Sequence, residues 1–137
     1  MTAKEYLKQA RYLDMRIESK KEQLVSLNDL ATKCTSVYSD MPKSPNRGTS
    51  RMEDVILKII DLEDEISDDM NLLVELKKKI METIKMVPNT ELQALLEKRY
   101  LCHTSWEQIA VDMNYSIQHI HRMHNAALKE VAAIIET

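Results

Sequence analysis

The side chains best suited to binding chemistry are concentrated in residues 116–129, a stretch without any acidic residue. Its polar side chains are amides, imidazoles and two cations, and we expect a helix here that turns them outward. Glutamine and asparagine can pair with adenine, and arginine with guanine, in a DNA major groove wide enough for one helix. The sequence therefore predicts a surface for reading duplex DNA, made up of Ile117, Gln118, His119, His121, Arg122, Asn125 and Lys129.

Backbone donors at two predicted helix starts would assist this surface. Thr104 is followed three residues later by Glu107, a capping box that predicts a helix over 105–112. Ser116 is a natural N-cap for a longer helix over 117–135. Free N–H groups at helix starts can bind phosphate. We therefore add three residues to the DNA-binding candidates, namely Thr104, Ser105 and Ser116.

The three histidines of this stretch also permit an interpretation as a metal site. His121 and His124 are three residues apart and could share a helix face. Zinc needs four ligands, and no carboxylate or thiolate nearby completes the set, since Cys102-His103 is a lone dipeptide. We expect no metal and no cofactor, and interpret the histidines as DNA-facing or solvated. Protonation near pH 6 would add positive charge, so we expect DNA binding to strengthen on acidification.

Composition excludes several other classes of protein. The 137 residues are 44% hydrophobic, with one glycine, three prolines and no phenylalanine, which favours an all-α fold over a sandwich or barrel. No glycine-rich phosphate loop or catalytic constellation is found, so we predict no catalytic residue and no enzyme. Without an apolar signal core or a run of about 20 apolar residues, we expect a cytoplasmic protein with no membrane contact. Cys34 and Cys102 are interpreted as reduced thiols.

Three predicted helices must hold the candidate surface. Thr90 followed by Gln93 is a second capping box, and it predicts a supporting helix over 91–101. Asn114 tolerates the left-handed conformation of the turn between the next two helices, and small Ala110 allows them to cross closely, as in a helix-turn-helix. The alternative is a three-helix packing module without a DNA role. The expected core residues are Leu92, Leu95, Leu96, Tyr100, Leu101, Trp106, Ile109, Tyr115, Ile120, Met123, Ala127, Leu128 and Val131.

Two long helical patterns precede these helices. Residues 3–38 and 51–87 match in length, and the loop over 39–50 that separates them holds two prolines and the only glycine. Equal helices joined in this way predict a long antiparallel coiled-coil hairpin. We therefore expect two domains, a helical hairpin over 1–87 for oligomerisation or partner binding, and a DNA-binding helix-turn-helix domain over 88–137.

Apolar heptads support the hairpin, although polar residues interrupt them. In the second helix Met52, Ile59, Ile66, Leu73, Ile80 and Val87 recur every seven residues. Lys20 interrupts the seam of the first helix, and Asp69 and Thr83 interrupt that of the second. Two helices alone leave some apolar side chains poorly covered. We expect a second copy of the hairpin or another protein to pack on them, or the C-terminal domain as the alternative; they are Ile56, Ile60 and Leu72.

The run from Ser105 to Leu128 resembles the fourth conserved region of bacterial sigma factors. The matched features are Ile109-Ala110, the turn ending in Ser116, Ile120 and Ala127-Leu128. The whole chain looks like a family of small proteins from phages and prophages of low-GC Gram-positive bacteria, in which a helical segment precedes a sigma-like domain. More distantly, it is similar to phage late-gene transcription regulators of the RinA and ArpU kind. The stretches that carry the family likeness are residues 1–13, 39–47, 51–56 and 98–101.

The resemblance implies that promoter-like DNA is bound through the last helix, with Ile117, Gln118, His121 and Arg122 as base-reading candidates. Regions like those that melt promoters in a full sigma factor are missing, so the resemblance implies a regulator and not a complete initiation factor. We therefore hypothesise a phage-type transcription regulator that forms a homodimer through the hairpin and contacts host RNA polymerase. The alternative is an assembly or DNA-packaging adaptor that acts through the hairpin.

Overall fold

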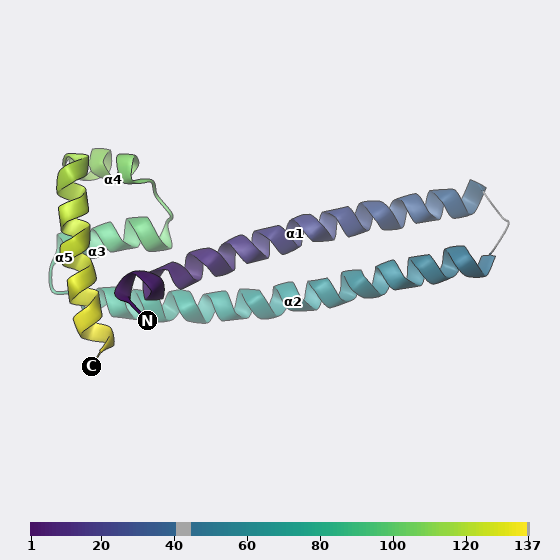
Figure 1. Cartoon of the computed structure of the whole chain (residues 1–137), viewed down its shortest axis with the longest axis horizontal. Coiled ribbons are helices and arrows are strands. Elements are labelled where there is room, and N and C mark those ends of the chain that lie inside the picture. The colour runs from purple at the N-terminus through teal and green to yellow at the C-terminus, as the bar shows by residue number, and fades with distance from the viewer. Residues whose placement is uncertain (41–44, 137) are drawn as a thin grey trace. The chain divides into compact units, whose positions relative to one another are not determined.

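The structure of the chain is a computed structural model that describes the backbone of residues 1–40 and 45–136, and the side chains of residues 1–33 and 50–136. All regular structure in these ranges is helical, which confirms the predicted all-α class. The described helices include none that is long and apolar enough to cross a membrane. The elements are α1 (Ala3–Asp40), α2 (Pro45–Lys85), α3 (Thr90–Leu96), a π-helical turn η1 (Glu97–Leu101), α4 (Trp106–Met113) and α5 (Ile117–Ile135) (Figure 1).

The connection between the two long helices is shorter than predicted. α1 continues to Asp40 and α2 begins at Pro45, so residues 39–40 and 45–50 of the predicted loop are helical. A proline suits the first helical position, because its ring fixes φ and its missing N–H would have no partner there. The rest of the predicted loop, residues 41–44, lies outside the described residues.

The helices divide into two compact units. The first unit contains Met1–Asp14 and Leu72–Thr137, and the second contains Met15–Asn71. α1 and α2 therefore each contribute residues to both units. The C-terminal helices α3, η1, α4 and α5 all belong to the first unit, together with the first turns of α1 and the last turns of α2.

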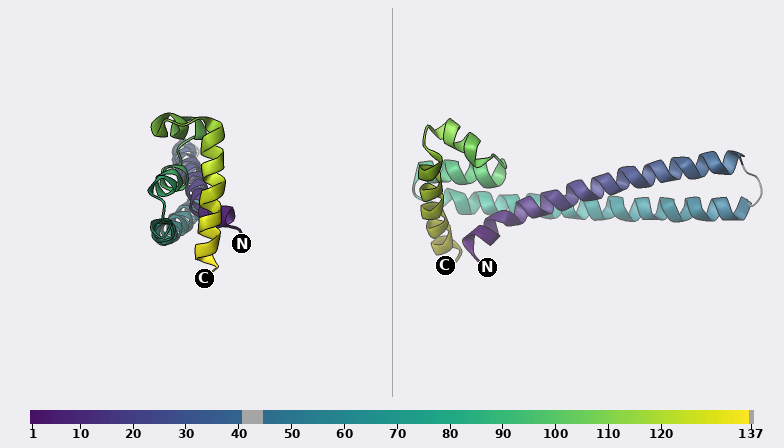
Figure 2. Two further views of the ribbon diagram at one scale, coloured as in Figure 1. Left: turned by 90° about the vertical axis from the view of Figure 1, so that its left-hand side faces the viewer. Right: turned by 45° about the horizontal axis from the view of Figure 1, so that its top comes forward.

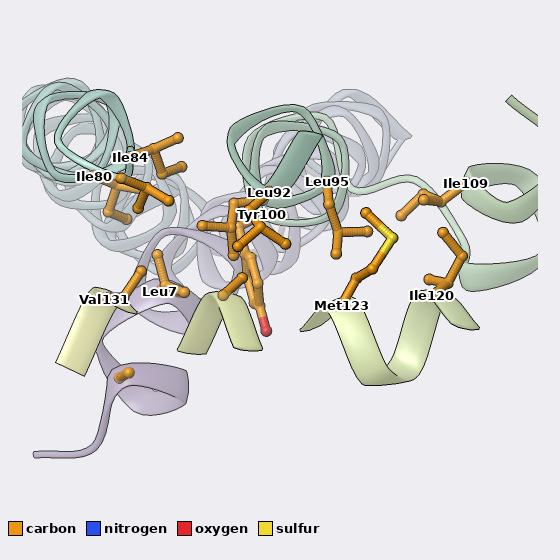
Figure 3. Packing of buried hydrophobic residues seen from close by; sticks show 14 of the residues in the cluster. Leu7, Ile80, Ile84, Leu92, Leu95, Tyr100, Ile109, Ile120, Met123 and Val131 are labelled. Carbon is orange, nitrogen blue, oxygen red and sulfur yellow. The ribbon is translucent and has the colours of Figure 1, made fainter. Parts of the chain in front are cut away.

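One hydrophobic core holds the first unit together. Nine of the core residues expected from the sequence are buried, namely Leu92, Leu95, Leu96, Tyr100, Ile109, Ile120, Met123, Ala127 and Val131. Ala110, which was expected to allow a close helix crossing, is buried as well. Leu101, Trp106, Tyr115 and Leu128 are only partly buried at its edge. The same cluster includes Leu7 and Ala10 of α1 and Ile80 and Ile84 of α2. In Figure 3, Leu7 of α1 and Val131 of α5 point toward one another.

In the second unit, α1 and α2 run antiparallel around a thin apolar seam. Ile17, Val55, Leu62 and Ile66 are its buried side chains. Lys20 and Asp69, each of which interrupts an apolar heptad, form an ion pair with one another, and their side chains are 16% and 17% exposed. The two polar interruptions therefore face each other, and neither is left opposite an apolar residue.

The third polar interruption is matched in the same way in the first unit. Thr83 donates its hydroxyl hydrogen to the carbonyl of Lys79, so the Tyr6 hydroxyl donates to the Thr83 oxygen at 2.9 Å. The apolar side chains expected to be poorly covered are indeed exposed. The exposed fraction is 45% for Ile56 and 48% for Ile60 in the second unit, and 53% for Leu72 in the first.

Candidate nucleic-acid interface

Helices α4 and α5 are joined by a short turn whose conformation follows from local sequence. Asn114 adopts the left-handed conformation, with φ 60° and ψ 40°, and its N–H bonds back to carbonyls of the last turn of α4. Ser116 then caps α5, because its Oγ accepts a hydrogen bond from the His119 N–H at 3.1 Å. Both features are confirmed as predicted. Figure 2 shows α4 crossing the N-terminal end of α5. Ala110 of α4, expected to allow a close crossing, is buried.

The other two predicted helix starts are wrong by one residue. The N-cap of α3 is Asn89, whose side-chain oxygen accepts from the Glu91 N–H at 2.9 Å, and Thr90 is the first helical residue. The N-cap of α4 is Ser105, whose Oγ accepts from the Gln108 N–H at 3.2 Å, in place of Thr104. Asparagine and serine are at least as good caps as threonine, so the better of two adjacent residues takes the position.

One face of α5 presents polar side chains to solvent. Gln118, His121, Arg122, Asn125 and Lys129 are all exposed. Their spacing of three and four residues places them on one side of the helix. We call these five residues the outer strip. Ile117 beside it is 38% exposed, and Ser105 and Ser116 are also exposed, whereas Thr104 and His119 are half-buried.

Two histidines of α5 are held by aromatic rings. The ring of His121 lies 5.2 Å from that of Trp106, and the ring of His119 lies 4.4 Å from that of Tyr115, measured between centroids. Trp106 begins α4 and Tyr115 lies in the turn, so these contacts tie the start of α5 to the preceding helix. The start of α5, which carries part of the outer strip, is therefore fixed by packing against Trp106 and Tyr115.

His124 is buried, which corrects the expectation that all three histidines are solvated or face DNA. Only 6% of it is exposed, and its ring lies 4.6 Å from that of Trp106. Its Nε2 atom is 2.6 Å from the Tyr100 hydroxyl oxygen. Burial, with repulsion from Lys4 and Arg99, lowers the pKa of His124 to about 4, and burial raises the pKa of Tyr100 to about 12. His124 is therefore neutral at pH 6 and adds no charge there.

A signal for this burial was present in the sequence. Ile120, His124, Ala127 and Val131 follow one another at spacings of four, three and four, which is the inner face of an amphipathic helix. Three of the four are apolar and fully buried. His124 occupies the remaining position of that face, and the Tyr100 hydroxyl satisfies its ring nitrogen.

Arg99 was not predicted as a site residue, although it is packed against the candidate interface. Its guanidinium lies 4.4 Å from the centroid of the Trp106 ring, a cation–π contact. It also donates a hydrogen bond to the Thr104 carbonyl at 3.1 Å. Arg99 belongs to the π-helical turn η1, and no short sequence pattern indicates that turn.

Two acidic residues near α4 have polar partners. Asp112 accepts hydrogen bonds from Lys98 at 3.1 Å and from Gln108 at 2.8 Å, and these bonds lower the pKa of its carboxyl group. Glu91 accepts from the Tyr115 hydroxyl at 3.1 Å. Lys98 therefore compensates the negative charge of Asp112, whereas the neutral Tyr115 hydroxyl leaves the charge of Glu91 in place.

Comparison with known proteins gives a family but no activity. The model of a family described as "Protein of unknown function (DUF1492)" matches residues 36–132, which is more than half of the chain. No curated protein and no solved structure matches the chain. The matched range includes every DNA-binding candidate named above.

Proposed function

Since the chain belongs to the DUF1492 family, whose description assigns no activity, we propose its function from geometry: it is a phage-type transcription regulator that binds promoter-like DNA through α5. The observation that carries this proposal is the outer strip. Five exposed side chains able to contact base edges or phosphates share one face of a capped helix, and residues 116–129 hold no carboxylate to repel DNA. The likeness to the fourth region of sigma factors, and more distantly to RinA- and ArpU-type regulators, supports the same proposal.

In this proposal the N-terminal half of α5 enters the major groove. Arg122 is suited to guanine, and Gln118 and Asn125 are suited to adenine. The starts of α4 and α5, capped by Ser105 and Ser116, face backbone phosphates with their free N–H groups. Lys129 lies at the far end of the outer strip and contacts a phosphate.

Charge indicates that one copy binds weakly. Residues 89–137 contain four Lys and Arg against six Asp and Glu, so 4 − 6 leaves a net charge of −2. Few phosphate contacts give a low, salt-sensitive affinity. A homodimer, or a complex with RNA polymerase, would place additional contacts on the same DNA and raise the affinity. The exposed Ile56 and Ile60 of the second unit are the proposed dimer contact.

The experiment that tests this function first selects bound duplexes from a random pool, with the protein alone and with host polymerase. Gln118→Ala and Arg122→Ala are then compared with the wild type on the selected sequence. We expect each to weaken specific binding by about 1–3 kcal/mol and to relax selectivity at one base position. Gln23→Ala and Arg16→Ala, on the exposed surface of the second unit, are matched controls. Wild-type affinity in both α5 variants would reject α5 as the reading helix.

A second candidate function is an assembly or DNA-packaging adaptor. The observation in its favour is the apolar surface of the second unit, where Val25 and Leu57 are 60% and 59% exposed in addition to Ile56 and Ile60. Exposed apolar surface of this kind is typical of protein interfaces. The mass in solution separates the two functions, since a dimer fits a regulator and a ring of eight or more copies fits a packaging adaptor.

A further inference from the structure

A basic pocket lies in the first unit, outside the outer strip. Lys8, Arg11 and Tyr12 of α1 and Arg99 and Tyr100 of η1 line a cavity of about 190 Å³. All three charged residues of its lining are cations. Arg11 and Tyr12 are exposed, so the pocket is accessible from solvent.

The described cations of this pocket form no direct ion pair with a carboxylate. Among the described side chains, no carboxylate lies within 4.0 Å of Lys8, Arg11 or Arg99, although shorter ion pairs are formed elsewhere in the chain. Lys4 precedes Lys8 by one helical turn and adds a positive charge to the same side of α1. Asp14 follows Arg11 by three residues on α1 and offsets part of this charge, although its carboxylate contacts His103, at 3.9 Å, and none of the three cations of the pocket. The cations repel one another, and an anion between them would relieve that repulsion.

The pocket is connected to the outer strip through Trp106. The Arg99 guanidinium lies over the indole ring at 4.4 Å, and the ring of His121 lies 5.2 Å from the same indole. One aromatic side chain therefore separates a cation of the pocket from a residue of the outer strip. Under the proposed function, a duplex bound along the outer strip would have its backbone near Trp106 and hence near this pocket.

We infer that the pocket binds a phosphate group of the DNA backbone beside the base-reading helix. Guanidinium and ammonium groups are the donors that phosphate oxygens accept most strongly, and the two arginines can bind in a bidentate way. A free phosphate would satisfy the same chemistry, so the experiment must separate the two sources. The assignment to DNA rests on the proposed function, whereas the phosphate site itself does not.

Inorganic phosphate tests the site alone. Trp106 is the only tryptophan, and displacement of Arg99 toward a bound anion would change its fluorescence. We expect a saturable fluorescence change with phosphate, in excess of that with sodium chloride at equal ionic strength. The change should be abolished in Lys8→Gln/Arg11→Gln and kept in Arg16→Gln/Lys21→Gln, which removes the same charge from the same helix. A response equal to that of chloride, or equal in all three proteins, would overturn the site.

Duplex DNA then tests the source of the phosphate. We expect Lys8→Gln/Arg11→Gln to weaken binding by about tenfold for each phosphate interaction that it removes near 0.1 M salt, equally on selected and random duplexes, and to reduce the salt slope by about 1–2. Unchanged DNA affinity together with an abolished phosphate response would overturn the DNA assignment and identify a site for a free phosphate compound. Wild-type protein that binds no DNA would contradict the proposed function, and the phosphate titration would still decide the site.

Folding of the variants is checked by helical circular dichroism before either titration. If the double variant loses helix, the single variant Arg11→Gln, at an exposed position, replaces it in both titrations. It should lower the phosphate affinity by less than the double variant does. An affinity identical to the wild type in a folded Arg11→Gln protein would remove Arg11 from the site and overturn this pocket as the place where phosphate binds.

Discussion

At the scale of single residues, α5 shows how position on a helix decides the chemistry of a side chain. His119, His121 and His124 lie within six residues of one another in three different environments. His119 is half-buried against Tyr115, His121 is exposed beside Trp106, and His124 is inside the core. His124 therefore does not contribute to the expected strengthening of DNA binding on acidification.

His124 predicts how stability depends on pH. Its pKa is about 4 in the folded chain, against an ordinary value of 6.5, so between these values the unfolded chain binds more protons than the folded one. The free energy of unfolding therefore falls as the pH falls from 6.5 toward 4, by on the order of 2–3 kcal/mol from this group, and above pH 6.5 the group has no effect. Urea denaturation across this range measures the change.

The matched variant for this measurement is His124→Phe, which keeps an aromatic ring against Trp106 and cannot be protonated. Carboxyl groups also titrate toward pH 4, so the quantity to compare is the difference in pH slope between the two proteins. Wild type should lose stability more steeply than His124→Phe. Equal slopes for the two would show that His124 is not held neutral by the core.

At the scale of helices, local signals were predictable and tertiary ones were not. Asn114 and Ser116 were assigned correctly, because a left-handed residue followed by a cap is determined by neighbouring residues. The predicted N-caps of α3 and α4 were each one residue away from the observed ones, because adjacent side chains compete for the same N–H groups. The turn η1 and the contact of Arg99 with Trp106 depend on how distant helices pack, and no short pattern in the sequence encodes that.

The polar residues within the apolar seam pair with one another, and the sequence alone did not predict these pairs. Lys20 and Asp69 each break a heptad, and in sequence each weakens the hairpin prediction. In the structure they pair, as Tyr6 and Thr83 do further along. Matched polar residues fix which turn of α1 lies opposite which turn of α2, because a shift along the seam would leave each of them facing apolar groups.

This pairing predicts the behaviour of a double-mutant cycle. Lys20→Met leaves the Asp69 carboxylate 17% exposed without its partner, and we expect a decrease of about 1–3 kcal/mol in the free energy of unfolding. Asp69→Leu should be destabilising for the same reason. Lys20→Met/Asp69→Leu should recover most of the stability, as apolar residues then fill both positions. Additive decreases in the double variant, measured by urea denaturation, would contradict a direct coupling.

At the scale of the whole molecule, the second unit exposes several large apolar side chains. Seven of its described large apolar side chains are between 45% and 60% exposed, namely Met15, Val25, Leu30, Ile56, Leu57, Ile60 and Met70. We propose that Ile56 and Ile60 contact a second copy of the chain, so the mass in solution should be that of a dimer.

We expect wild-type protein to scatter light as a dimer and Ile56→Glu/Ile60→Glu as a monomer, because two carboxylates cannot be buried in an apolar contact. Ser67→Glu/Asn71→Glu adds the same charge at exposed polar positions of α2 and should remain dimeric. An unchanged mass for Ile56→Glu/Ile60→Glu would exclude this contact. A wild-type ring of eight or more would favour the adaptor function.

The composition of the first unit also determines when it can form during protein synthesis. Leu7 and Val131 share one core, yet Val131 is translated roughly 120 residues later, which is about 6–25 s at ordinary elongation rates. Ile80 and Ile84 of α2 are translated earlier and can cover the first turns of α1 in part, but the side that packs on α5 stays uncovered until then. The ribosome must therefore release α5 before the core of the first unit is complete, and a product terminated before residue 116 would lack the helix that we propose to bind DNA.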